Sequence, residues 1–290
     1  MKVVGFTFVR NALTYDYPVL ESLHSLLPLC DEVVVAVGNS SDDTLALIQS
    51  IDSPKIRLLE TTWDDTLREG GQVLAVETNK ALAAVPADAD WAIYLQADEV
   101  LHEADYAALR AGMERWKDAA NVDGLLLHYR HFYGSYDYVG DAARWYRREI
   151  RVVRPGRGVY SYRDAQGFRK NHNEKLRVKL LDVTVHHYGW VKPPEAMQRK
   201  QETFNKLWHS DEWMAEHIAP AAAFDYSQID SLQRFTGTHP AVMQARIQKQ
   251  NWQYDHDMSR NRQRFKDRLK HWVELRTGYR PGEYRNYKLV

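Results

Sequence analysis

Two adjacent carboxylates end an apolar run near the first third of the chain. The run "WAIYL", residues 91–95, is typical of a buried strand, and Gln96, Ala97, Asp98 and Glu99 follow it. Adjacent like charges repel, and neither can be buried without a partner. Carboxylates at a strand end suit a hard cation such as Mg²⁺ or Mn²⁺, held together with substrate phosphates. The alternative is that Asp98 caps the next helix while Glu99 faces solvent, and these residues alone favour neither reading.

A pair of histidines offers a further metal ligand. His186 and His187 stand in "VTVHHYGW", near the end of a strand-like segment. Side chains alternate along a strand, so the two rings are expected on opposite faces. On the residues alone, an ordinary pair of strand-end histidines, one of them buried and hydrogen-bonded, explains the motif better than a metal site does.

The elements that must position these side chains alternate in the first half of the chain. Strand patterns cover residues 3–9, 32–38, 55–61 and 91–98, and helical spacing covers 17–27, 40–51 and 71–85. Ser40 with Asp43 resembles a capping box at the start of the second helix. This alternation predicts an α/β fold with right-handed crossovers and a mainly parallel sheet. Ligands bind such sheets beyond the carboxyl ends of the strands, which is where Asp98 lies.

The pattern changes in the second half. Strand-like segments at 124–134, 149–155 and 176–189 precede a long helical pattern at 192–218, with Pro193 and Pro194 at its start. We therefore expect a catalytic domain over residues 1–190 and a helical C-terminal extension over 191–290.

Composition restricts the class of protein. The 290 residues carry no formal net charge, which gives no global electrostatic reason to bind nucleic acid. One cysteine, Cys30, excludes an internal disulfide and suits a reducing compartment. The first residues resemble a strand rather than a signal peptide, and no apolar run approaches the roughly 18 residues of a membrane span. A cytoplasmic protein is expected, and the sequence does not indicate its oligomeric state.

Four segments, taken in order, resemble the family 2 glycosyltransferases. They are "VRNA", "VVVAVGNSSDDT", "ETNKAL" and "DWAIYLQADE", and the resemblance covers residues 1 to about 192. It implies the GT-A fold and an inverting transfer of a sugar from a nucleoside-diphosphate donor to a hydroxyl of a saccharide or lipid-linked acceptor, in the synthesis of cell-surface polysaccharide or glycolipid. It also implies Mn²⁺ or Mg²⁺ on the donor diphosphate, with Asp98 and His187 as the ligands.

The sequence departs from the family pattern at two places. The first acid of the family's Asp-x-Asp signature is Gln96 here, which keeps an oxygen but loses a charge. Val37, Gly38 and Asn39 stand where the family often has an acid that reads the base. Asn39 can still hydrogen-bond a base edge, so UDP, GDP and dTDP all remain candidate nucleotides.

The resemblance also implies a carboxylate base between the signature and the late histidine. Transfer to a hydroxyl needs a base within hydrogen-bond reach of it. Asp164 in "YSYRDAQGF" is the first candidate and Glu174 in "NHNEKL" the second. The residues expected to contact the substrates come from loops at the same sheet edge or follow the signature and the late histidine: Thr7, Arg10, Asn39, Gln72, Asn79, Gln96, Glu99, Trp190 and Lys192.

The sequence leaves two alternative functions possible, and its basic C-terminal segment could form a surface for a partner. A nucleotidyltransferase shares the sheet and the metal chemistry, but "TFVRNALTYDY" lacks its Gly-rich basic loop. Gln96 and Asn39 would also suit a degenerate transferase that only binds a nucleotide sugar or a partner. The basic segment 259–280 places four apolar residues on one stripe: Phe265, Leu269, Trp272 and Val273. That stripe either packs on the body of the protein or contacts an anionic membrane surface.

Overall fold

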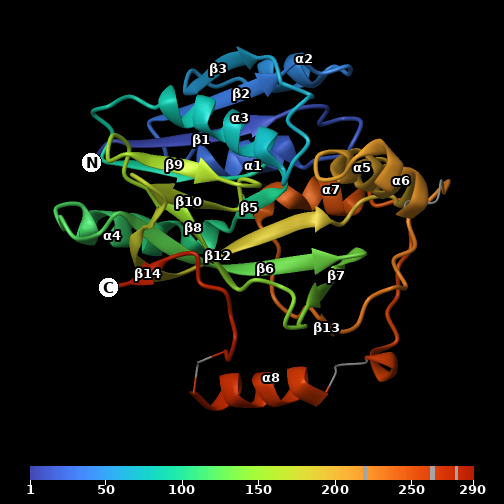
Figure 1. The fold of residues 1–290 in the computed structure, drawn as a ribbon. Helices are drawn as coiled ribbons and strands as arrows, with labels where there is room; N and C mark the ends of the chain where they lie inside the picture. The colour runs from blue at the N-terminus through green and yellow to red at the C-terminus, as the bar shows by residue number, and fades with distance from the viewer. Residues whose placement is uncertain (218–220, 262–264, 278–279) are drawn as a thin grey trace.

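A parallel sheet forms the N-terminal half of the protein. A computed structural model describes residues 1–217, 221–261, 265–277 and 280–290. Strands and helices alternate in this half: β1 (Val3–Val9), α1 (Val19–Leu26), β2 (Glu32–Gly38), α2 (Thr44–Gln49), β3 (Ile56–Thr61), α3 (Gln72–Ala83) and β4 (Trp91–Tyr94). The strands lie in the order β3-β2-β1-β4, and every neighbouring pair is parallel. The predicted α/β class is confirmed (Figure 1).

The beginning of α2 differs from the prediction. No side chain caps this helix, which starts at Thr44 after Asp43. The Ser40 Oγ instead accepts a hydrogen bond from the Asn11 backbone N–H at 3.0 Å, and the Thr44 Oγ1 accepts one from the Ala12 N–H at 2.7 Å. The predicted capping box was therefore wrong, because Ser40 binds the loop after β1 and no side chain caps α2.

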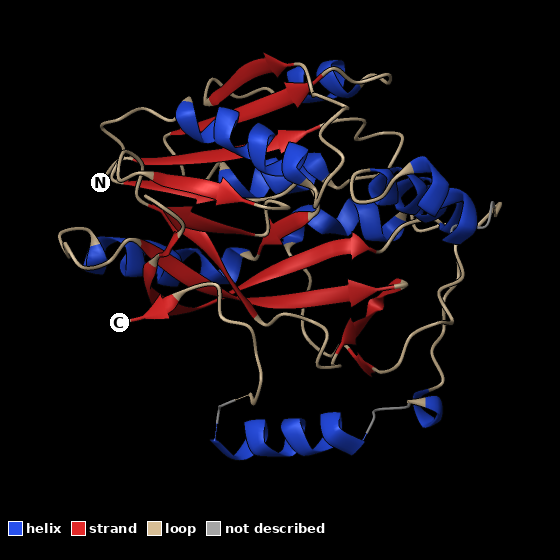
Figure 2. Cartoon of the chain, in the orientation of Figure 1, coloured by secondary structure: helices blue, strands red, loops and turns tan. Residues whose placement is uncertain are grey.

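Antiparallel strands extend the sheet beyond β4. Residues 99–190 form β5 (Glu99–Leu101), the 3₁₀ turn η1 (Glu103–Asp105), α4 (Tyr106–Trp116), β6 (Gly124–Tyr133), β7 (Ser135–Gly140), β8 (Arg148–Val153), β9 (Val159–Tyr162), β10 (Gly167–Lys170), β11 (Glu174–Lys175) and β12 (Arg177–Trp190). β8 pairs antiparallel with both β4 and β6, while β12 runs parallel to β6. β9, β10 and β11 form a separate three-stranded sheet. The arrowheads of β6 and β12 point to the side on which α5 and α6 lie (Figures 1 and 2).

The C-terminal hundred residues mix helices with strands. They form α5 (Pro194–Lys206), α6 (Asp211–His217), β13 (Leu232–Arg234), η2 (Ala241–Met243), α7 (Gln244–Gln248), η3 (Met258–Arg260), α8 (Phe265–Thr277) and β14 (Lys288–Leu289). Pro194 opens α5 as predicted. β13 pairs with β7 and β14 pairs with β12, so this segment completes the main sheet as well as supplying helices. The boundary at residue 190 stays a prediction.

The helix α8 leaves its apolar side chains in contact with solvent. Leu269 and Trp272 are 53% and 54% exposed, while Glu274 pairs with Arg147. The side chain of Phe265 lies outside the described residues. In the part of the chain that the structure describes, no helix is both long and apolar enough to cross a membrane. Contact of this helix with a membrane surface stays a prediction.

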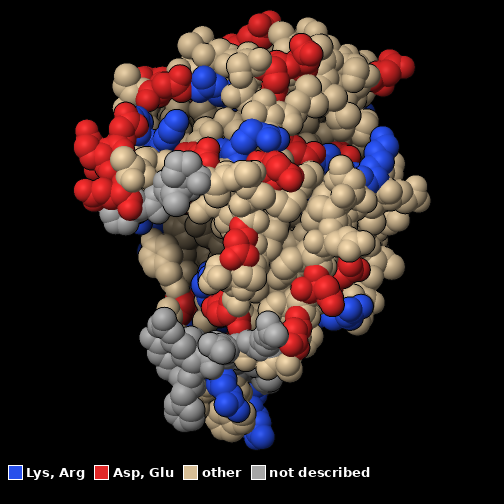
Figure 3. All heavy atoms as spheres, turned by 90° about the vertical axis from the view of Figure 1, so that its right-hand side faces the viewer, with Lys and Arg blue, Asp and Glu red and all other residues tan. Residues whose placement is uncertain are grey.

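Positive and negative side chains are interspersed on the face that carries α5 and α6. Figure 3 shows Lys and Arg beside Asp and Glu over most of this face, with a group of Asp and Glu side chains at its left edge. This distribution agrees with the zero formal charge of the chain. Any preference for a charged ligand must therefore arise from local side chains.

Candidate functional site

A cavity of about 750 Å³ opens beyond the carboxyl ends of β1 and β4. It is lined by residues 8–11 at the end of β1, by residues 96–98 after β4, and by Thr203, Asn205 and Lys206 near the end of α5. One face of α5 also contributes Met197, Lys200, Gln201 and Phe204. These α5 residues recur at spacings of three and four, which places them on one side of the helix. We call this space the strand-end cavity. Its position is the one at which open parallel sheets bind ligands.

Asp98 lies between an ammonium and an imidazole group in the strand-end cavity, those of Lys200 and His187. Its Oδ2 accepts a hydrogen bond from Lys200 Nζ at 3.0 Å, and its Oδ1 lies 3.7 Å from His187 Nε2. Burial alone would raise the pKa of Asp98, but Lys200, His187 and Lys192 together hold that pKa below its usual range. Asp98 is therefore ionised at neutral pH, with Lys200 as its direct counter-ion.

A chain of hydrogen bonds fixes the tautomer of His187. The Tyr146 carbonyl can only accept, so His131 Nε2, 2.8 Å away, carries the proton. Burial lowers the pKa of His131 to about 3, so its Nδ1 is free to accept from His187 Nδ1 at 3.1 Å. Burial also lowers the pKa of His187 to about 4. His187 is therefore neutral, and this network assigns a lone pair to Nε2 on the side of Asp98.

Glu99 does not reach the cavity, although it was predicted to contact substrate. Glu99 and Arg151 are both fully buried and form a two-pronged pair, with N–O distances of 2.8 Å. The Tyr129 hydroxyl and the Gln96 N–H also donate to this carboxylate, at 2.8 and 3.1 Å. The two adjacent acids thus point in different directions. Glu99 pairs with Arg151 inside the sheet, and Asp98 pairs with Lys200 at the cavity.

The loop that carries Asp164 closes another side of the cavity. Arg163 and Ala165, on either side of Asp164, have φ values of 56° and 62°, which non-glycine residues seldom adopt. Gln96 Nε2 donates to the Ala165 carbonyl at 3.4 Å, which ties this loop to the end of β4. Burial raises the pKa of Asp164 above its usual value. A partly buried carboxylate with a raised pKa suits a general base.

An aromatic and basic group of side chains lines the end of the cavity near β1 and β2. Phe8, Arg10, Trp63 and Asp65 all line it. The Arg10 guanidinium lies 5.4 Å from the Trp63 ring centre and pairs with Asp65. Asn39 Oδ1 accepts from the Trp63 backbone N–H at 3.0 Å, so Asn39 holds the backbone at Trp63 and is not itself part of the lining.

Several predicted contact residues lie away from the lining of the strand-end cavity. Lys192 is fully buried and donates to the Asp16 carbonyl at 3.0 Å. Thr7 is buried within β1. Asn79 exchanges two hydrogen bonds with the Ser161 backbone. Gln72 and Glu174 are exposed at the starts of α3 and β11. Six predicted residues do line it together: Arg10, Gln96, Asp98, Asp164, His187 and Trp190.

The donor set does not fit a resident divalent cation. Asp98 and His187 converge, and Gly189 leaves space between them, because a Cβ there would lie within 2.7 Å of both side chains. However, Gln96 is neutral and Asp98 is already balanced by Lys200. Within the described ranges, no three His, Cys, Asp or Glu side chains gather in a way that could hold a metal ion. The predicted Mn²⁺ or Mg²⁺ therefore enters no step below.

Glu149 stands behind the cavity wall and is expected to make stability depend on pH. It accepts from Gln166 Nε2 at 2.8 Å, and burial raises its pKa from 4.5 to about 7 against the opposing effect of Arg151. The pKa of Glu149 is higher in the folded than in the unfolded state. The stabilising contribution of the protonated side chain is therefore fully present below about pH 4.5 and is lost as pH rises through about 7. The loss amounts to about 3 kcal/mol.

The variant Glu149→Gln should be free of this loss. Urea unfolding at several values between pH 5 and pH 8.5 would measure it, with the variant gaining stability relative to wild type as pH rises. Two parallel profiles would show that Glu149 titrates normally.

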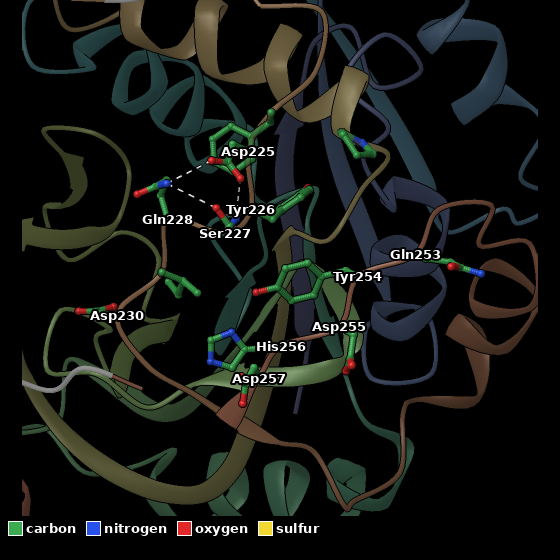
Figure 4. Close-up of a pocket in the computed structure, with 13 residues that line it drawn as sticks. Asp225, Tyr226, Ser227, Gln228, Asp230, Gln253, Tyr254, Asp255, His256 and Asp257 are labelled. Carbon is green, nitrogen blue, oxygen red and sulfur yellow. Dashed lines mark hydrogen bonds between the residues drawn. The ribbon is translucent and has the colours of Figure 1, made fainter. Parts of the chain in front are cut away.

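A second cavity, of about 800 Å³, lies among the loops at residues 224–230 and 253–257. Figure 4 shows Asp225, Tyr226, Tyr254 and His256 around it, with Gln228 bonded to Asp225 and to Ser227. None of the predicted site residues lines this cavity.

Comparison with known proteins gives structural matches only. No protein-family profile and no curated protein sequence match the chain. S. aureus TarS in complex with UDP superposes with a TM-score of 0.42 and 13% identity, over 70% of this chain and 64% of that one. Mycobacterium tuberculosis glucosyl-3-phosphoglycerate synthase, in complex with Mn²⁺, UDP and phosphoglyceric acid, superposes with a TM-score of 0.30 and 15% identity. That match covers 45% of this chain and 43% of the synthase.

A third match is a synthase of another type. The 4-diphosphocytidyl-2C-methyl-D-erythritol synthase of Anaerococcus prevotii gives a TM-score of 0.39 and 12% identity, over 71% of this chain and 94% of that one. The same 70% of this chain spans only 39% of a longer TarS structure.

Proposed function

We propose that this protein transfers a sugar from a nucleoside-diphosphate donor to a hydroxyl acceptor in the strand-end cavity. The observation that carries the proposal is the arrangement along this cavity: an aromatic end at Trp63, an ion-paired centre at Asp98 and Lys200, and a partly buried carboxylate at Asp164. These are the groups needed to hold a base, to balance a diphosphate and to activate a hydroxyl. The sequence resemblance to family 2 glycosyltransferases supports the same reaction.

The donor would lie along the cavity from β2 toward β12. Its base would stack near Trp63, where Arg10 adds a planar cation. Its diphosphate would lie toward Lys200, and Arg68 and Lys206 also line the cavity. Trp190 lines the same space and would contact the sugar.

In the reaction, Asp164 would accept the proton of the acceptor hydroxyl as that oxygen attacks the anomeric carbon. The bond from this carbon to the diphosphate oxygen breaks on the opposite side, which inverts the centre. The leaving oxygen takes the electron pair and its negative charge must be stabilised. A saccharide or lipid-linked acceptor, in the synthesis of surface polysaccharide or glycolipid, belongs to the proposal.

A panel of nucleotide sugars tests this function. UDP-, GDP- and dTDP-hexoses are each incubated with the protein, and release of the nucleoside diphosphate is followed with and without Mn²⁺. A bound nucleotide at 100 times its Kd should raise stability by about 2.7 kcal/mol in a thermal-shift assay. Stabilisation without turnover of any donor would favour the binding-module alternative. Release of pyrophosphate from a nucleoside triphosphate and a sugar phosphate would favour a nucleotidyltransferase.

Replacing Trp63 by Ala should weaken nucleoside-diphosphate binding by about 5- to 160-fold, because a stacked base contributes roughly 1–3 kcal/mol. Trp272→Ala is the matched control, since Trp272 lies on α8 and is exposed. Calorimetric titration of both variants measures the difference. Equal affinities for the two would remove Trp63 from the base site.

A further inference from the structure

We infer that the ammonium of Lys200 acts as a tethered cation that takes the place of a divalent metal at the leaving diphosphate. This inference rests on the proposed function and assigns the charge that balances the leaving group. Lys200 was not among the residues that the sequence singled out, because it is one of several charged residues in a helical stretch.

The position of Lys200 is built by three elements. It projects from α5, and its Nζ donates to Asp98 Oδ2 after β4 and to the Gly189 carbonyl in β12, each at 3.0 Å. The same ammonium lies 5.0 Å from the Tyr17 ring centre and 5.7 Å from that of Phe204. Its side chain is only 12% exposed, yet it lines the strand-end cavity. A lysine held by a carboxylate, a carbonyl and two rings is fixed in place rather than free in solvent.

The negative charge at this end of the cavity is enough for one monovalent cation, which is Lys200. Gln96 removes the acid that would otherwise add a second negative charge beside Asp98. The single charge of Asp98 is already matched by Lys200 at contact distance. A divalent ion bound to Asp98 would have to displace or oppose this ammonium.

The chemistry of the step requires a positive charge in the same place. When the bond from the anomeric carbon to the diphosphate breaks, the electron pair moves onto the leaving phosphate oxygen. An ammonium with a proton left to donate can stabilise that oxygen by charge and by a hydrogen bond. Asp98 then acts as a positioning residue, since its carboxylate holds the Lys200 ammonium in place at the cavity.

The test is calorimetric titration of UDP, GDP and dTDP in EDTA and, separately, in millimolar Mn²⁺. Wild type is compared with Lys200→Gln, Lys200→Arg and the control Lys249→Ala, whose exposed side chain is outside the cavity lining. In EDTA we expect wild type and the control to bind alike, Lys200→Gln to bind at least tenfold more weakly, and Lys200→Arg to recover part of the loss. Adding wild-type protein to a mixture of Mn²⁺ and nucleotide should leave the electron paramagnetic resonance spectrum of the free Mn²⁺ unchanged.

Other results would overturn the inference. Wild-type binding that strengthens more than about threefold with Mn²⁺, or a Lys200→Gln variant that binds like wild type in EDTA, would show that a metal supplies the charge and would leave the proposed function intact. If no nucleoside diphosphate binds in either buffer, the proposed function falls and the inference falls with it. Should Lys200→Gln not fold, as judged by circular dichroism, the metal response of wild type alone decides.

Discussion

Replacement of Asp164 by Asn is expected to lower the rate of sugar transfer by about 10²–10⁴ and to leave nucleoside-diphosphate affinity nearly unchanged. Asp164 lines the strand-end cavity on a loop that Gln96 ties to the end of β4. A base contributes to the transition state and little to donor binding, so kcat should fall while the Kd for the donor nucleotide does not. Because burial raises the pKa of Asp164, the acidic limb of the wild-type rate profile should lie above the usual range for Asp.

Glu174→Gln is the matched control for this experiment. Glu174 is the other acid that the sequence offered, and it is exposed on β11, outside the cavity lining. Steady-state rates and donor titrations of both variants separate chemistry from binding. If Asp164→Asn turns over like wild type while Glu174→Gln is inactive, the assignments must be exchanged.

Replacement of Glu99 by Gln is expected to lower the free energy of unfolding by about 3–5 kcal/mol, because it leaves the buried Arg151 without a counter-charge. Arg151 is fully enclosed, and its guanidinium lies 5.1 Å from the ring centres of both Tyr94 and Tyr129. Water therefore cannot replace the lost carboxylate. Urea unfolding monitored by circular dichroism measures the change as a lower midpoint.

A double variant separates the lost pair from the lost packing. Glu99→Leu with Arg151→Met removes both charges together, and such replacements are often neutral or stabilising for buried pairs. We expect the double variant to be more stable than Glu99→Gln alone. A Glu99→Gln protein within 1 kcal/mol of wild type would show that this pair does not support the fold.

The local patterns of the first half were enough to predict its fold. The apolar runs at β1, β2 and β4 have the length and β-branched content of strands buried on both faces, and helical periodicity separates them. The short strands β5, β7, β9, β10, β11, β13 and β14 were missed because they carry little periodic signal over two to six residues. The long helical pattern at 192–218 is broken at 207–210 between α5 and α6, which local spacing did not indicate.

Part of the site depends on contacts between distant segments, which spacing alone does not reveal. Asp98 and His187 were expected as metal ligands and Asp164 as the base of the same reaction, and the three line one cavity. The divergence of Asp98 and Glu99 could not be predicted, because it depends on Lys200 and Arg151, which lie 102 and 52 residues further along the chain. Lys192 was singled out for its place beside the "HYGW" motif, but the backbone takes its side chain inward to Asp16.

The central claim, that a donor nucleotide binds in the strand-end cavity, is tested most directly by a crystal structure of the protein soaked with the nucleoside diphosphate that stabilises it most. We expect the base against Trp63 and the terminal phosphate within hydrogen-bond distance of Lys200 Nζ. Nucleotide density in the second cavity, or a diphosphate that lies away from Asp98 and Lys200, would contradict it.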